Sequence, residues 1–174
     1  MQDIEALATA NAGAFTTAIE PFTIGGRTFE TDNEPLIMGV VNRSWDSTYR
    51  DSVAPTPADA VRRARILFHQ GAHVIDVGAE SSRAGGLRVS THDQIDALIP
   101  VVEELSADHV PVSIESYDTD VIHAAVSAGA CVVNLTGTRD DDAIFDIIGS
   151  AGAAVDVFHA CLLYTSDAAD EVLG

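Results

Sequence analysis

The chain has 174 residues, 47% of them apolar, which is enough to bury the core of one domain. It carries 27 acidic residues against 9 basic ones, with a formal net charge of −18. Nucleic acid is therefore not expected as a partner, because phosphate binding needs a basic face. No apolar run approaches the roughly 20 residues that span a bilayer, and the N-terminus lacks the basic region of a signal peptide. We expect a cytoplasmic protein without a membrane partner.

A β-hairpin is the first element expected. Gly25 and Gly26 separate two short β-prone runs within residues 21–31, and a glycine pair favours a tight turn between antiparallel strands. This hairpin belongs to an N-terminal extension, residues 1–33, and precedes the main fold.

From residue 36 onward, short Val- and Ile-rich runs alternate with helical patterns, which is typical of βα units and a parallel sheet. The expected strands are Leu36–Val41, Val74–Val77, Val112–Glu115, Cys131–Leu135 and Ala154–His159. The expected helices are Thr56–Gln70, Ser90–Ala107, Thr119–Ala128 and Asp140–Ser150. Thr56 and Ser90 stand where N-caps belong, and Gly71, Gly129 and Gly152 stand where glycine ends a helix. The sequence therefore predicts an α/β fold.

Three segments resemble the dihydropteroate synthase family at the ends of its strands. Residues 36–47 are similar to its MGI(L/V)NVTPDSF motif, and residues 74–85 to IDVGGESTRPG. Residues 112–117, followed after one helix by residues 129–134, are similar to ISVDTY and AGAxxIND. The resemblance implies an incomplete TIM (β/α)8 barrel of about five parallel strands in residues 34–160, whose floor the hairpin closes.

The resemblance also implies an activity. The family is a transferase that condenses 6-hydroxymethyl-dihydropterin pyrophosphate with para-aminobenzoate in folate biosynthesis, with Mg²⁺ as cofactor and a possible homodimer. We expect the fragment to be inactive alone, because the later barrel strands carry further site residues. Two alternatives stay open: a pterin-binding methyltransferase, which has no pyrophosphate to hold, and a non-catalytic pterin-binding paralogue.

Site residues follow from the resemblance, position by position. Asn42 is the expected metal ligand, and Asp46 and Ser47 belong to the loop expected to cover the site. Ser82 and Arg83 are the expected catalytic residues at the pyrophosphate, where a guanidinium can bind two phosphate oxygens at once.

On the pterin side the expected residues are Glu115 and Asn134, whose polar groups can pair with the ring. Each of these site residues could instead be an ordinary polar loop or strand-end residue. We expect structural roles for Asp76 and Glu80, since an internal carboxylate there can organise the Arg83 loop by charge-assisted bonds.

The chain departs from the family at Trp45, Thr48, Ser82, Ala84, Glu115 and Leu135. Leu135 replaces an aspartate, and we expect this change to remove a charge from the pterin side. Residues 161–174 bear no relation to the family and resemble a translated sequencing adapter, so we expect a foreign tail that packs poorly. The alternative is a genuine helix from Thr165 onward.

Overall fold

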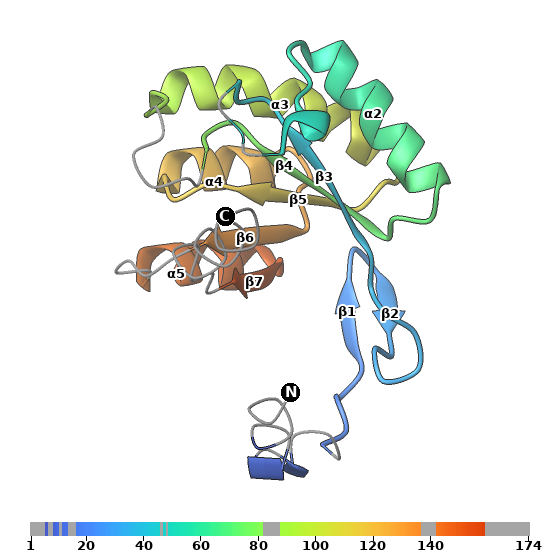
Figure 1. Cartoon of the computed structure of the whole chain (residues 1–174). Coiled ribbons are helices and arrows are strands. Elements are labelled where there is room, and N and C mark those ends of the chain that lie inside the picture. The colour runs from blue at the N-terminus through green and yellow to red at the C-terminus, as the bar shows by residue number, and fades with distance from the viewer. Residues whose placement is uncertain are drawn as a thin grey trace, which may run out of the picture.

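A parallel sheet of five strands forms the centre of the computed structural model, which describes residues 17–45, 47, 49–81, 88–136 and 142–158 and positions 6, 9, 10, 12 and 13. The strands stand side by side in chain order (Figure 1). They are β3 (Met38–Asn42), β4 (Val74–Gly78), β5 (Val112–Glu115), β6 (Val132–Thr136) and β7 (Ala154–Phe158). All five predicted strands are confirmed, with bounds shifted by two residues at most.

Each strand is joined to the next through a helix, and successive helices contact one another outside the sheet. The helices are α2 (Pro57–His69), α3 (Thr91–Ala107), α4 (Thr119–Ser127) and α5 (Asp142–Ala151), and the 3-10 turn η2 (Arg50–Ser52) precedes α2. The predicted caps are confirmed, since the side chains of Thr56 and Ser90 accept backbone N–H bonds from Asp59 and Asp93. The alternation of strands and helices thus confirms the predicted fold class.

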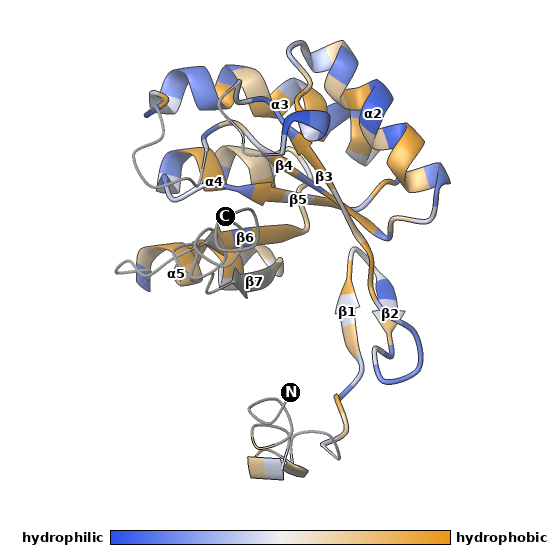
Figure 2. Ribbon diagram, viewed as in Figure 1, coloured by the Kyte–Doolittle hydropathy of each residue, from blue (hydrophilic) through white to orange (hydrophobic). Residues whose placement is uncertain are grey.

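The sheet has one face turned to the helices. Residues at alternate positions, such as Val41, Val77 and Ile114, lie in the apolar core between sheet and helices and are fully buried. Figure 2 shows β5 and β6 mostly in the orange of apolar residues, whereas α2 and α3 also carry the blue of hydrophilic residues. Leu135 belongs to this core and is 1% exposed, so the expectation that it removes a charge from the pterin side is wrong. A side chain at this position of β6 points away from Asn134, because successive residues of a strand face opposite sides.

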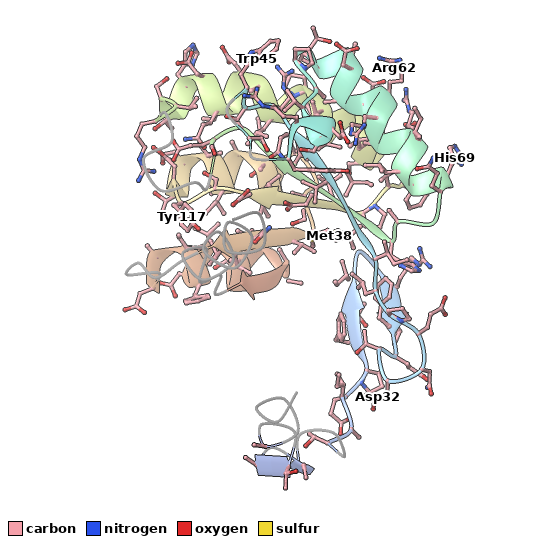
Figure 3. All side chains as sticks on the ribbon, viewed as in Figure 1. Asp32, Met38, Trp45, Arg62, His69 and Tyr117 are labelled. Atoms are coloured by element: carbon pink, nitrogen blue, oxygen red, sulfur yellow. The ribbon has the colours of Figure 1, made fainter. Side chains whose placement is uncertain are left out.

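The hairpin closes the amino ends of the strands on the opposite face. Strands β1 (Phe22–Ile24) and β2 (Arg27–Phe29) pair in antiparallel fashion around Gly25 and Gly26, as predicted. Ile24 and Phe29 pack with Val74 and Val132, which begin β4 and β6. Figure 3 shows Met38 at this end of the sheet and Trp45 at the other end of the chain segment that contains β3. We call the face of the sheet opposite the helices the inner face. The hairpin covers this face at the amino ends of the strands and leaves it uncovered at their carboxyl ends.

In the described parts of the chain, none of the helices combines the length and the apolar character that a bilayer crossing requires.

Asp118 caps α4 and provides a test of this local structure. Its carboxylate accepts the backbone N–H groups of Asp120 and Val121, and its pKa is lowered from the ordinary value of 3.8, mainly because Thr91 Oγ1 donates to it. A lowered pKa means that the ionised group stabilises the fold above its ordinary pKa, and that this contribution is lost as the pH falls through the folded-state value.

Asp118→Ala is therefore expected to reduce the free energy of unfolding by about 1 kcal/mol at pH 7, the usual value of an N-cap. The difference from the parent chain should shrink below pH 3.8 as the carboxylate is protonated. Urea unfolding at a series of pH values measures this, with the exposed neighbour Asp120→Ala as the control. An equal loss in both variants at every pH would show that the cap contributes nothing specific.

Candidate functional site

Four residues at the carboxyl ends of neighbouring strands form one row across the sheet. The register pairs Asn42 with Gly78, Gly78 with Glu115, and Glu115 with Asn134. In-register neighbours point to the same face of a sheet, and this row alternates with the residues that face the helices. Three polar side chains from β3, β5 and β6 therefore stand together on the inner face, and β4 contributes only a glycine between them.

The Asn42 amide is held in one orientation. Its Nδ2 donates to Ser47 Oγ at 3.0 Å and to Ser52 Oγ at 2.7 Å. Ser52 is fully buried, and its hydroxyl donates a hydrogen bond to the backbone oxygen of Tyr49 at 2.6 Å. Its oxygen can therefore act only as an acceptor toward Asn42. Both amide hydrogens are used in this way. The amide oxygen is consequently directed away from the serines, toward Gly78 and the rest of the row.

A second oriented amide lies on β6. Asn134 Nδ2 donates to Asp76 Oδ2 at 3.2 Å, and Asp76 Oδ1 accepts from Ser113 Oγ at 2.6 Å. Asp76 is 4% exposed and Ser113 is fully buried, so these contacts lie out of water. Asn134 Oδ1 is buried and has no hydrogen-bond partner within the described structure. An unpaired buried acceptor costs about 1–3 kcal/mol, which a ligand donor placed there would recover.

Glu115 stands between the two amides. Its Oε2 lies 3.2 Å from the position that a Cβ on Gly78 would take, and Asn42 Oδ1 lies 3.5 Å from the same position. The Glu115 carboxylate and the Asn42 amide oxygen thus border the same space above β4, which a larger residue at Gly78 would fill. Glu115 also lines a cleft of about 210 Å³ beside the strand ends.

Glu80, just after β4, bonds to residues that lie shortly before α3, and we call this connection the loop neck. The two carboxylate oxygens accept from Arg88 Nη1 at 2.5 Å and from the backbone N–H of Val89 at 2.9 Å. Both partners stand at the far end of the loop that begins at Ser81. These contacts agree with the structural role expected for Glu80.

A buried glutamine ties this neck to the strand that carries Glu115. Gln94 donates from Nε2 to the backbone oxygen of Val89 at 3.1 Å and accepts from Ser116 Oγ at 3.0 Å. Gln94 and Ser116 are 6% and 4% exposed. The loop neck and the end of β5 are therefore held at a fixed distance from each other, and both line the same cleft.

The structure brings together Asn42, Ser47, Glu115 and Asn134 among the predicted site residues. Asp46, Ser82 and Arg83 lie outside the described residues, so their roles stay predictions. Sequence reasoning missed the residues that orient the site, namely Ser52, Ser113 and Gln94. The only sequence feature that pointed to them was a polar residue at a position where strand or helix periodicity predicts burial. Ser113, within β5, is an example.

The fit of a divalent cation can be judged from the donor atoms. Within the described ranges, no three His, Cys, Asp or Glu side chains are grouped so as to hold a metal ion. The row instead offers the fixed Asn42 oxygen and the nearby Glu115 carboxylate, which are hard ligands of the kind that Mg²⁺ accepts. Mg²⁺ commonly takes one or two protein ligands and completes its shell with substrate phosphates and water, so these residues fit.

Comparison with known proteins agrees with the motifs. The sequence profile of a family described as pterin binding enzyme matches residues 38–172, beyond residue 160 where the sequence predicts the barrel segment to end. The dihydropteroate synthase of Mycobacterium leprae is 35% identical over 124 residues, covering 71% of this chain and 44% of that protein. The chain thus spans less than half the length of this relative.

Solved structures show the same likeness in three dimensions. Yersinia pestis dihydropteroate synthase, solved with a sulfonamide drug complex, has a TM-score of 0.71 at 28% identity over 80% of this chain and 50% of that one. The Burkholderia cenocepacia enzyme complexed with 7,8-dihydropteroate has a TM-score of 0.65 at 29% identity over 80% of this chain and 46% of that one. The aligned part of the chain therefore corresponds to about half of each of these proteins.

Proposed function

The chain belongs to the pterin-binding enzyme family, and we propose that it supplies the first half of a dihydropteroate synthase. This enzyme would be a transferase that joins 6-hydroxymethyl-dihydropterin pyrophosphate to para-aminobenzoate and releases pyrophosphate. The observation that carries the proposal is the inner-face row of Asn42, Glu115 and Asn134, with a buried Asn134 oxygen that lacks a donor. The remaining strands of a closed barrel would complete the site.

The pterin ring would bind at the β5–β6 end of the row. Its exocyclic amine and ring N–H groups are donors, and the Asn134 oxygen and Glu115 carboxylate are acceptors on adjacent strands. Asp76 accepts from the Asn134 NH2 group, so the amide oxygen would be the group that faces the ring. Because the acceptor is already fixed, little orientational freedom is lost when the pterin binds.

The pyrophosphate would bind at the β3–β4 end, near Asn42, Ser82 and Arg83. A net charge of −18 repels an anion at long range, so the leaving group needs positive charge supplied locally. Asn42 would hold Mg²⁺ there, with its amide oriented by Ser47 and Ser52, and the bound cation would neutralise charge on the departing pyrophosphate. Arg83 would bind the phosphate oxygens through two parallel N–H bonds.

Water has to be excluded during the chemical step. In that step the pterin carbon loses pyrophosphate, and the para-aminobenzoate amine attacks this carbon. Asp46 and Ser47 would cover the site from the loop after β3. Glu80 and Gln94 both bond to the backbone of Val89 and so fix the point where the chain returns after the segment that contains Ser82 and Arg83. A cytoplasmic location and a homodimer belong to the same proposal.

Two ligands separate the pyrophosphate site from the pterin site experimentally. Fluorescence titration of the chain with 6-hydroxymethyl-dihydropterin and with its pyrophosphate ester is expected to show binding of both. Asn134→Ala should weaken both by about tenfold, since one buried hydrogen bond is lost. Arg83→Ala should weaken only the ester, by at least about tenfold, and the exposed Arg62→Ala should change neither.

The outcomes identify the reaction class. If Arg83→Ala lowers the affinity for both ligands equally, the pterin-binding methyltransferase is favoured, because that enzyme has no pyrophosphate to hold. If Asn134→Ala leaves pterin affinity unchanged, the site is misplaced. Pterin binding without product formation in the complete protein would identify a binding paralogue.

A further inference from the structure

We propose that Glu115 is a cation ligand in this chain, forming with Asn42 a two-oxygen site for a divalent metal above Gly78. This deepens the proposed function and depends on it only for the identity of the phosphate substrate. The extra methylene of a glutamate at the end of β5 would thus connect the pterin and pyrophosphate ends of the row.

The first ligand is fixed before any metal arrives. Both hydrogens of the Asn42 amide are donated to serine oxygens at 3.0 and 2.7 Å, and the buried Ser52 cannot reverse its role because its hydrogen is bound to Tyr49 O. The Asn42 oxygen is therefore locked on the side of Gly78. Ligands held by such outer hydrogen bonds bind metal more tightly, since no rotation has to be arrested on binding.

The second ligand reaches the same place from two strands away. Glu115 Oε2 and Asn42 Oδ1 lie 3.2 and 3.5 Å from the point where a Gly78 side chain would start. Glycine is the one residue whose absence of a side chain leaves this space open. Glu115 Cβ lies 3.6 Å from the same point, so the whole side chain borders this space, and a side chain one methylene shorter would place its oxygens differently around it.

The donor set suits Mg²⁺ or Mn²⁺. An amide oxygen and a carboxylate are hard ligands, and two protein ligands leave positions for phosphate oxygens and water. The carboxylate also lowers the electrostatic cost of holding a doubly charged ion next to the neutral amide. The register places Asn134 next to Glu115, on β6.

Mn²⁺ titration of the 15N-labelled chain tests this site directly, because a bound paramagnetic ion broadens nearby amide signals. At about 0.3 M NaCl, which screens the acidic surface, the Gly78 and Arg43 signals are expected to broaden first. Glu115→Gln and Gly78→Ala should each require at least about tenfold more Mn²⁺ for the same broadening. Gly78→Ala removes no ligand and only fills the space between them.

Matched variants separate this effect from general charge. Glu103→Gln removes an exposed carboxylate on α3 and should leave the titration unchanged, whereas Glu115→Asp keeps the charge, loses the reach and should weaken binding. Each variant's spectrum also reports whether its fold is intact. Unchanged broadening in Glu115→Gln, or equal effects of Glu103→Gln, would overturn the proposal.

Titration of Asn134→Ala with pterin and with Mn²⁺ keeps the two claims apart. If Asn134→Ala weakens pterin binding and leaves the Mn²⁺ titration unchanged, the cation role of Glu115 is supported and the pterin site stands. If the parent chain binds Mn²⁺ at Gly78 but no pterin, the proposed function fails while the cation site remains.

Discussion

Replacing Asp76 with alanine is expected to lower the free energy of unfolding by about 3–5 kcal/mol. This carboxylate is 4% exposed and accepts from Ser113 Oγ at 2.6 Å and Asn134 Nδ2 at 3.2 Å. Its removal leaves two donors in the interior without their acceptor, and each unpaired buried group costs about 1–3 kcal/mol. Urea unfolding followed by circular dichroism measures the loss.

The control for Asp76 is Asp142→Ala, an exposed carboxylate in the first turn of α5, for which a change within about 0.5 kcal/mol is expected. Asp76→Asn keeps one acceptor oxygen and should fall between the two. Asp76→Ala should also lower pterin affinity, because the Asn134 amide is then free to turn its oxygen away. A loss of stability below about 1 kcal/mol would mean that water or a backbone shift replaces the carboxylate.

Most of the fold was predictable because its signals are local. The strand and helix patterns, the caps at Thr56 and Ser90 and the glycine turn at Gly25 each depend on residues close together in the sequence. These gave the five strands, four helices and hairpin with end positions within two residues for every one of them. The sheet order follows from the same alternation, since successive βα units add strands side by side.

The direction in which a strand-end side chain points was harder to predict. Leu135 was expected on the pterin side because it follows Asn134 in a family motif, and a motif does not indicate which face of the strand each side chain occupies. The register of β6 places Asn134 on the inner face and Leu135 in the helix-facing core. A shift of one residue reverses the face, so a motif position alone does not say which groups meet a ligand.

Interactions that depend on several distant segments could not be predicted. The role of Asp76 needs Ser113 and Asn134, which are 37 and 58 residues away along the chain. The closeness of Glu115 to Asn42 depends on the absence of a side chain at Gly78, on a third strand. Only the folded sheet brings these groups together, so a single sequence identified the candidate ligands but not the contacts that orient them.

Gly129 ends α4 in a conformation that only glycine adopts easily, with a φ of 112°. A Cβ at this position would lie 2.2 Å from Ser106 Oγ and 2.9 Å from Ser106 Cβ on α3, far inside van der Waals contact. Gly129→Ala is therefore expected to destabilise the chain by about 3–5 kcal/mol, combining backbone strain of about 1–3 kcal/mol with overpacking. Urea unfolding midpoints measure the change.

Gly71 offers the matched control, because it ends α2 with a φ of 106° but its Cβ would meet no atom within 4 Å. Gly71→Ala should show only the backbone strain. In the double variant Ser106→Gly, Gly129→Ala the clashing side chain is gone, so the added penalty should fall to the Gly71→Ala level within about 1 kcal/mol. If Gly129→Ala and Gly71→Ala lose equal stability, α3 and α4 can move apart without cost, and the contact between these helices does not hold the outer layer of the sheet together.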